Sequence, residues 1–315
     1  MQIFSSSAIV KTYAPAPHNP TLITPQRPDN HAITPDMHMT DSSQSSTPLS
    51  DAILNVKDVH FTYPQTTSPV LTDISLSLRT NRICALIGPN AAGKSTLIKL
   101  MLGQLSPTQG SITLGSHSVS SLPPIDRAKH ICYVPQRGSL SFAYTVRQVV
   151  EMGRFALGKS EAAVNWALEL CDLKPQENKI YAELSGGQQQ RVTIARALAQ
   201  SYTDPASSPS QNPASKLKVF LLDEPGSNLD LWHVQQMMNV LKERADAGFA
   251  VLVVLHDLNL AARYADDVIL LNQGNLVAAG PWDTVLQKHI LEDVYRVHLH
   301  QVHSEHTNRP MFFVD

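Results

Sequence analysis

Charged residues are scarce in this sequence, and neither sign dominates. Only 17% of the 315 residues are Asp, Glu, Lys or Arg, against about 25% in an average soluble protein. The 25 basic and 27 acidic residues leave a formal net charge of -2. Nucleic-acid-binding proteins normally carry a clear basic excess, so this balance argues against a nucleic-acid partner. The low charge is compatible with a surface that partner subunits cover.

Cysteines and long apolar runs are also rare. Cys84, Cys132 and Cys171 stand alone in apolar segments without a CxxC pair, which argues against a disulfide framework and against a zinc site. No apolar run approaches the ~18 residues that a membrane-spanning helix needs. The first short apolar stretch has no basic segment before it, so we expect no secretory signal. These absences favour a protein of the reducing cytosol.

Composition changes after residue 50. Residues 1–50 are rich in Ser, Thr, Pro, Asn, His and Gln, so we expect a disordered polar tail, with a partner-binding arm as the alternative. Residues 51–315 form the expected domain, and no internal repeat is found in it. Within this domain we expect a mostly helical subdomain at about 138–200. The Pro-rich segment 201–218 then predicts an inserted surface loop.

The apolar pattern predicts a sheet with a glycine-rich turn at one strand end. Residues Ile53–Tyr63 have the spacing of half-buried strands. A buried strand is expected at Ile83–Ile87, followed by a turn and a helix over Lys94–Leu102. The continuous apolar runs Val219–Leu222 and Ala250–Leu255 are typical of parallel strands that are buried on both faces. Strand, turn and helix in this order predict a parallel α/β fold.

The turn matches the phosphate-loop pattern GxxxxGK[ST] between the expected strand and helix. Backbone N–H groups of such a loop and of the helix N-terminus bind phosphate oxygens. Lys94 would place its charge against the β- and γ-phosphates, and the Ser95 hydroxyl would coordinate Mg²⁺. The predicted nucleotide contacts in this loop are Gly88, Pro89, Asn90, Ala91, Ala92, Gly93, Lys94, Ser95 and Thr96.

Two carboxylates, Asp223 and Glu224, directly follow the apolar run Val219–Leu222. An Asp at the end of a buried strand lies beside the phosphate loop, where it can bind Mg²⁺. Glu224 would then lie near the γ-phosphate and could accept a proton from the attacking water. An isolated Asp-Glu pair is usually a solvated strand end, but here it accompanies a phosphate loop.

A second glycine-containing motif, LSGGQQQR, covers Leu184–Arg191. Ser185 is suited to cap a helix, and the glycines allow close backbone approach. This helix N-terminus is a second anion-binding surface, formed by Ser185, Gly186, Gly187 and Gln188. One set of phosphates has no room for two such surfaces from the same chain. The simplest resolution is a second copy of the chain, with each motif covering the nucleotide that the other copy holds.

These motifs and their order resemble the ATP-binding subunit of an ABC transporter, over residues from about 53 to 315. The resemblance implies an α/β P-loop NTPase fold of the ABC type, with a helical subdomain and an N-terminal antiparallel β region. It implies that Tyr63 stacks on adenine, that Gln136 senses Mg²⁺ and links to membrane subunits, and that His256 contacts the γ-phosphate. Ser227–Asp230 resembles the loop that communicates across the dimer.

The motifs and the resemblance together predict an ATPase that uses ATP and Mg²⁺. The predicted catalytic residues are Lys94, Gln136, Glu224 and His256. The predicted Mg²⁺ ligands are Ser95, Gln136 and Asp223.

Two positions depart from the family pattern. Ala91 stands where the family usually has Gly, and Gly226 where it usually has Thr. An Ala at position 91 is safe only if its φ stays negative. Neither change removes a charged or Mg²⁺-binding group, so we expect ATPase activity to survive.

Two stretches resemble the ATPases of iron-chelate, haem and cobalamin importers: Thr145–Arg154 and the segment LHDLNLAARYADDVILLNQGNLVAAGPWDTVL. The resemblance implies a homodimer bound peripherally to permease subunits at the cytoplasmic face of the inner membrane, and indirectly to a substrate-binding protein. The cargo would be a ferric siderophore, haem or cobalamin. The alternatives are an importer of another cargo and a soluble ABC-type ATPase acting on ribosomes or DNA. A single cassette without sustained heptads favours transport.

Four histidines lie close together near the C-terminus: His298, His300, His303 and His306. A His-rich tract can bind a metal ion. The alternation of these histidines with Val297, Leu299 and Gln301 instead predicts a short terminal hairpin with the histidines on its solvent face.

Overall fold

The computed structural model describes residues 52–136, 138, 140, 142–203, 218–303 and 309–315. The predicted tail 1–50, most of the predicted loop 201–218 and His306 lie outside the described residues. No helix in the described ranges is both long enough and apolar enough to span a membrane.

The first sheet is antiparallel and has the strand order β2-β1-β4-β5. It consists of β1 (Ala52–Phe61), β2 (Leu71–Arg79), β4 (Gln109–Leu114) and β5 (His117–Ser118). Leu54 of β1 lies opposite Leu78 of β2 and Leu114 of β4. Because buried and exposed residues alternate along most of β2, one face of this sheet packs into the core. The expected N-terminal antiparallel region is confirmed.

The second sheet has six strands in the order β10-β9-β3-β8-β7-β6. Its strands are β3 (Arg82–Ile87), β6 (Ile131–Val134), β7 (Val219–Leu222), β8 (Ala250–Val254), β9 (Asp267–Asn272) and β10 (Asn275–Pro281). All neighbours are parallel except β10, which pairs antiparallel with β9. The phosphate loop, Gln136, Asp223 and His256 all follow carboxyl ends of these parallel strands, the edge where α/β sheets bind ligands.

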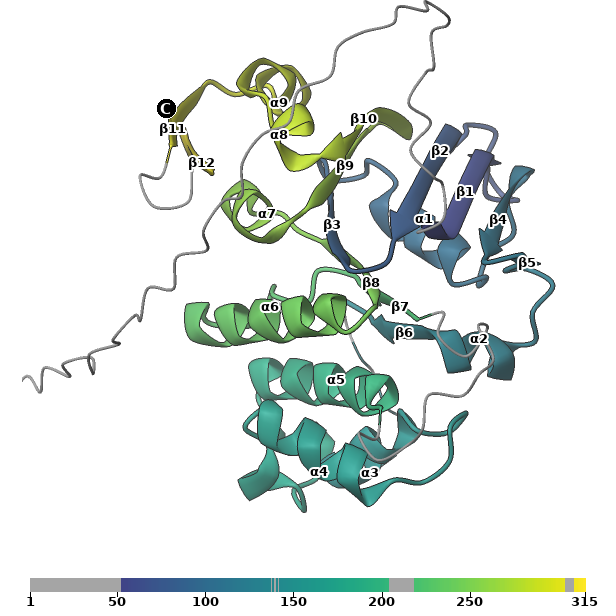
Figure 1. The fold of residues 1–315 in the computed structure, drawn as a ribbon, viewed down its shortest axis with the longest axis vertical. Helices are drawn as coiled ribbons and strands as arrows, with labels where there is room; N and C mark the ends of the chain where they lie inside the picture. The colour runs from purple at the N-terminus through teal and green to yellow at the C-terminus, as the bar shows by residue number, and fades with distance from the viewer. Residues whose placement is uncertain (1–51, 137, 139, 141, 204–217, 304–308) are drawn as a thin grey trace, which may run out of the picture. The chain divides into compact units, whose positions relative to one another are not determined.

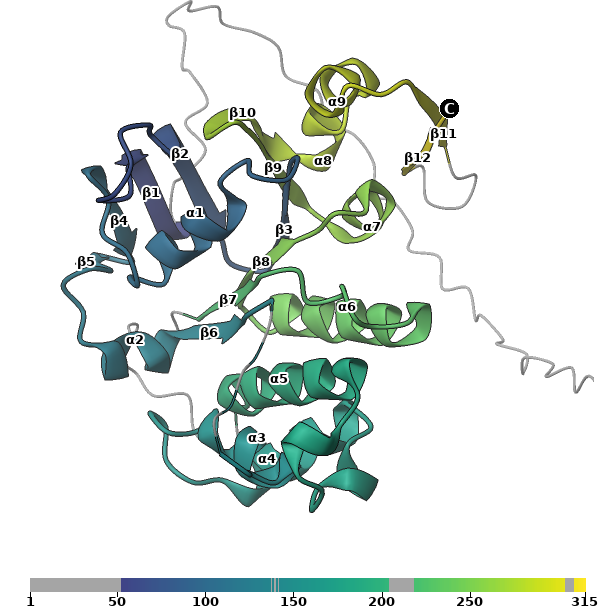
Figure 2. The ribbon, with the colours of Figure 1, turned by 180° about the vertical axis from the view of Figure 1, so that it is seen from behind.

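Helices cover both faces of this sheet (Figures 1 and 2). On one face, α1 (Lys94–Met101) packs with the antiparallel sheet in one apolar cluster. On the other face, α6 (Leu231–Asp246) and α7 (Leu258–Tyr264) belong to a second cluster. Three further helices are α2 (Pro124–His130), α8 (Trp282–Val285) and α9 (Lys288–Tyr295). The parallel strands are therefore buried on both faces, as their continuous apolar sequences predict.

Three helices between residues 146 and 201 lie together below α6 in the view of Figure 1. They are α3 (Val146–Met152), α4 (Glu161–Leu170) and α5 (Gly186–Ser201). Two 3₁₀ turns, Lys174–Gln176 and Tyr181–Glu183, connect α4 to α5.

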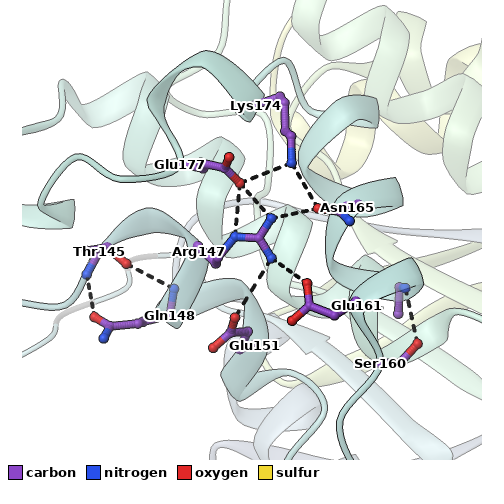
Figure 3. Close-up of polar contacts among 10 residues, drawn as sticks. Thr145, Arg147, Gln148, Glu151, Ser160, Glu161, Asn165, Lys174 and Glu177 are labelled. Atoms are coloured by element: carbon purple, nitrogen blue, oxygen red, sulfur yellow. Dashed lines mark hydrogen bonds and ion pairs between the residues drawn. The ribbon is translucent and has the colours of Figure 1, made fainter.

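Arg147 joins α3 to α4 and to the first 3₁₀ turn (Figure 3). Its guanidinium donates hydrogen bonds to Glu177 (2.7 and 3.0 Å), Glu161 (2.9 Å) and Asn165 (2.6 Å). Lys174 also donates to Asn165 and Glu177. A single planar cation thus contacts three segments of the chain at once.

The C-terminal residues form the predicted hairpin, with β11 (Leu299–His303) antiparallel to β12 (Pro310–Val314). Leu299 and Phe312 are buried, whereas His300 and His303 are exposed. His300 forms an ion pair with Asp315. The hairpin lies beside α7 in both views (Figures 1 and 2). No group of three or more His, Cys, Asp or Glu side chains that could hold a metal occurs among the described residues.

Candidate functional site

The phosphate loop has a backbone that requires glycine at two positions. Gly88 has φ 147° and Gly93 has φ 99°. A Cβ at Gly88 would lie 2.1 Å from the carbonyl oxygen of Leu271, and a Cβ at Gly93 would lie 2.6 Å from Cδ2 of Leu71. Both conformation and space therefore exclude other residues here.

Ala91 does not have the negative φ that would make an alanine at this position free of strain. Its φ is 63°, in the left-handed region, where a side chain costs roughly 1–2 kcal/mol. The condition for a safe exchange, a negative φ, is therefore not met, and Ala91 carries backbone strain. At Gly226, in contrast, an added Cβ would only make an ordinary contact with Val234, 3.4 Å away.

Lys94 is buried inside its own loop, with 6% of its surface exposed. Its ammonium donates hydrogen bonds to the carbonyl oxygens of Gly88 (2.6 Å) and Pro89 (2.9 Å). Burial lowers the pKa of Lys94, and the nearby carboxylates of Glu224 and Asp223 act in the opposite direction. Because burial disfavours the charged form of Lys94, an anion that enters the loop strongly stabilises this charge.

Tyr63 lies next to the start of α1. Its hydroxyl is 3.3 Å from the Thr96 hydroxyl, and its ring packs edge-on against Phe61 with the centroids 4.8 Å apart. The structure thus places the predicted adenine-stacking aromatic beside the phosphate-loop helix.

Asp223 extends β7 toward the phosphate loop. Its backbone N–H donates to the Val134 carbonyl at 2.9 Å, and its carboxylate accepts a hydrogen bond of 3.3 Å from the Ser95 hydroxyl. Burial raises the pKa of Asp223, while the bond from Ser95 acts against this rise. A carboxylate and a hydroxyl side by side form the all-oxygen donor set that Mg²⁺ prefers.

Glu224 is the meeting point of three strand ends. Gln136, which follows β6, donates a hydrogen bond from Nε2 to Oε2 of Glu224. His256, which follows β8, places Nε2 2.5 Å from Oε1. Glu224 itself has φ 48°, a backbone conformation that costs energy in a non-glycine residue. Glu224 therefore contacts two other residues predicted to be catalytic, which come from distant parts of the sequence.

The LSGGQ motif forms a separate group. Ser185 is the N-cap of α5, as predicted, and it exchanges hydrogen bonds with Gln188 in a capping box. A Cβ at Gly187 would lie 2.8 Å from the Asn228 carbonyl oxygen. The motif thus packs against the loop Ser227–Asp230. In the described residues, no hydrogen bond or ion pair joins Ser185–Gln188 to the phosphate loop of the same copy.

Two neighbours of His256 were not among the predicted site residues. Asp257 caps α7, and Asn259 forms hydrogen bonds with the backbone of Phe312. An Asp directly before a helical segment is a recognisable start signal. No local signal predicts that Asn259 contacts a strand 53 residues further along the chain.

Comparisons with known proteins agree with this geometry. Residues 71–203 match the family model described as ABC transporter. The hemin import ATP-binding protein HmuV of Shewanella denitrificans is 37% identical over 264 residues, which cover 82% of this chain and 99% of that protein. HmuV of Pseudomonas entomophila is 38% identical over 258 residues, which cover 80% and 96%.

Solved structures give the same result. The ATP-binding subunit of an ABC transporter superposes with a TM-score of 0.66 and 26% identity, covering 78% of this chain and 98% of that chain. A metal-chelate type ABC transporter in an inward-facing conformation has a TM-score of 0.65 and 27% identity, covering 84% and 98%.

The fold and the phosphate-loop site define an α/β P-loop ATPase, which confirms the predicted fold class. More particularly, the chain belongs to the ABC transporter family, as an ATP-binding subunit whose ATP hydrolysis is coupled to transport.

Proposed function

We propose that this chain powers the import of an iron chelate, with haem as its cargo. The observation that carries the proposal is the contact of Glu224 with Gln136 and His256, beside the Ser95–Asp223 pair. This is the arrangement needed to hydrolyse ATP bound in the phosphate loop. The identity of 37–38% to hemin import ATP-binding proteins supports the cargo.

In the proposed reaction, Lys94 and the backbone N–H groups that the phosphate loop offers bind the phosphates, and Tyr63 stacks on the adenine. Ser95, Asp223 and Gln136 would hold Mg²⁺, which would neutralise charge on the phosphate oxygens. Glu224 orients the attacking water and accepts its proton. Gln136 and His256 each contact one oxygen of Glu224, and a second lone pair on each oxygen remains available to the attacking water.

We further propose that His256 then contacts the γ-phosphate. Its side chain is 46% exposed, so it can turn toward a bound nucleotide without unpacking the core.

The proposed active form is a dimer of two identical chains. The α5 N-terminus, Ser185–Gln188, would cover the nucleotide of the other copy. Among the described residues it makes no hydrogen bond or ion pair with the phosphate loop of its own copy. The close packing of Gly187 on Asn228 supports a coupled movement of this motif and the Ser227–Asp230 loop.

The proposed permease contact lies beside α3, on the cytoplasmic face of the inner membrane. Phe155 and Phe142 are 84% and 72% exposed. A groove of about 450 Å³ next to Phe155 is lined by residues that include Tyr133, Met152 and Arg196. Exposed aromatic side chains beside a groove are typical of a subunit interface.

Uptake in a deletion strain tests the cargo. The strain is supplied with labelled haem, a labelled ferric siderophore or labelled cobalamin, and carries either this chain or its Glu224→Gln variant. The proposal requires haem uptake that depends on Glu224. Uptake of the siderophore, cobalamin or another cargo in place of haem would show that the chain powers import of that cargo and would overturn the haem proposal. Co-purification with ribosomes or DNA, without a permease, would overturn the transport proposal.

A further inference from the structure

Helix α7 begins two residues after His256, so a displacement of this helix is transmitted to the histidine through the backbone. Asp257 is the N-cap of α7, and its Oδ1 accepts hydrogen bonds from the backbone of Asn259 (2.7 Å) and Leu260 (3.3 Å). His256 is therefore joined to the first turn of α7 through one capped residue. A shift of this turn would move the backbone of His256 with it.

The apolar packing of α7 alone holds this helix weakly. It has seven residues, of which Ala261 and Ala262 are fully buried, while Leu258, Leu260 and Tyr264 are only partly buried against the main apolar cluster. A methyl group buries little apolar surface, and a helix of this length is not stable by itself. Polar contacts with other segments must therefore contribute to its placement.

Asn259 makes two such contacts with the C-terminal hairpin. Its Nδ2 donates to the Phe312 carbonyl oxygen at 3.1 Å, and its Oδ1 accepts from the Phe312 N–H at 2.7 Å. The side-chain amide thus pairs with β12 as a neighbouring strand would. Phe312 is itself only 5% exposed and belongs to the main apolar cluster, so it is a fixed anchor.

The other end of α7 is held by the same hairpin. Arg309 donates hydrogen bonds of 2.7 Å to the carbonyl oxygens of both Ala262 and Ala265. Its guanidinium also stacks on the Trp282 ring, 4.8 Å from the centroid. A cation at these carbonyls complements the C-terminal end of a helix. The segment Arg309–Phe312 therefore contacts α7 at both ends, in agreement with their adjacency in Figure 2.

We infer that Asn259 is a positioning residue, through which the C-terminal hairpin holds His256 in place to contact Glu224. The inference rests on the proposed function, because that function gives His256 its role. Asn259 touches neither the nucleotide-binding loop nor Glu224. It acts through the backbone of α7, and it makes the hairpin part of the hydrolytic site.

The Asn259→Ala variant of the full chain tests this inference. Loss of both bonds to Phe312 frees the first turn of α7, so kcat for ATP hydrolysis should fall about tenfold. The KM for ATP should stay unchanged, because Lys94 and the phosphate loop are untouched. In the His256→Ala background the same substitution should cause no further loss, since the two residues act as one unit.

Gln200→Ala is the matched control. The Gln200 amide also bridges backbone groups, donating to the carbonyl oxygens of Ala128 (2.6 Å) and Ile131 (2.9 Å), but it lies at the far end of α5. The Gln200→Ala substitution should lower Tm without lowering kcat. Each variant is assayed at a temperature at which circular dichroism shows it to be folded. Asn259→Asp, which keeps the acceptor for the Phe312 N–H, serves as a milder second variant and should lower kcat in the same direction.

The outcomes separate the two levels of the argument. Normal kcat in both folded Asn259 variants, together with impaired His256→Ala, overturns the inference and leaves the proposed function intact. A further loss of kcat when Asn259→Ala is added to His256→Ala also overturns it. Normal turnover of His256→Ala alone overturns both the inference and the proposed role of His256.

Discussion

His256 contacts Glu224 from a neighbouring strand end, with Nε2 2.5 Å from Oε1. The two residues follow β8 and β7, which pair in parallel register. The sheet therefore brings the two residues to the same edge. Their contact also leaves Glu224 only 15% exposed, so the carboxylate is shielded from solvent in the absence of a nucleotide.

Replacing Glu224 by Gln should abolish hydrolysis but preserve ATP binding. The amide keeps the size of the side chain but cannot accept a proton, and general-base catalysis typically contributes 10²–10⁴-fold. We expect phosphate release to fall at least about 100-fold, with unchanged ATP affinity and an ATP-dependent dimer in size-exclusion chromatography. Asp246→Asn, on the exposed end of α6, is the control that should hydrolyse ATP normally. Turnover near the wild-type rate in Glu224→Gln would remove Glu224 as the base.

Asp223 should make the apoprotein more stable at low pH than an ordinary aspartate would. Burial raises the pKa of this carboxyl in the folded state, so the folded state binds the proton more tightly than the unfolded state. The folded state is therefore favoured at low pH, and this contribution is lost as the pH rises through the raised pKa.

Asp223→Asn should consequently raise Tm at neutral pH without Mg²⁺, and the gain should vanish as the pH falls into the range where Asp223 is protonated. Mg²⁺-dependent ATP binding of the wild type should weaken over the same range, because the metal requires the ionised form. Thermal unfolding across pH measures both trends. A gain in Tm that does not depend on pH would contradict this account.

Ala91→Gly should stabilise the protein, although glycine usually destabilises. The substitution removes the cost of a left-handed alanine, roughly 1–2 kcal/mol, and adds chain entropy to the unfolded state, about 0.5–1 kcal/mol. The expected net gain in unfolding free energy is up to about 1 kcal/mol. Ala92→Gly is the matched control, because Ala92 is buried and has no positive φ. In urea titrations it should lose stability, and a loss of stability in both variants would exclude strain at Ala91.

Arg147→Lys should destabilise the helices between residues 146 and 201. One ammonium cannot reproduce the planar fork that serves Glu177, Glu161 and Asn165. We expect a loss of about 1–2 kcal/mol, since the guanidinium is partly exposed to solvent. Lys129→Met, which breaks the exposed pair with Asp126, should change stability by less than about 0.5 kcal/mol. Equal losses of unfolding free energy in the two variants would show that the Arg147 network contributes no more to stability than an exposed ion pair.

The sequence was most informative where a local signal marks a boundary. The expected strand Ile83–Ile87 and helix Lys94–Leu102 differ by one residue from β3 and α1, because the phosphate loop separates them sharply. The N-cap at Ser185 was equally readable, since a serine directly before a helical segment is a local start signal.

Features that join distant segments could not be predicted from local patterns. Arg147 binds partners 14, 18 and 30 residues away, and Asn259 binds Phe312 across the chain. The φ of Ala91 was also unpredictable, because alanine by itself disfavours a positive φ and the fold of the loop imposes it. In each case the decisive energy comes from tertiary packing, which the order of residues does not display.

Lys94 donates its hydrogen bonds to the carbonyl oxygens of its own loop. These two carbonyl oxygens compete with any ligand for the Lys94 ammonium. A ligand must therefore bind the ammonium more strongly than two neutral oxygens do in order to replace them. A triphosphate can do so through its charge, whereas an uncharged nucleoside cannot. Selection for polyanions is thus established at the first encounter, before any base or sugar is recognised.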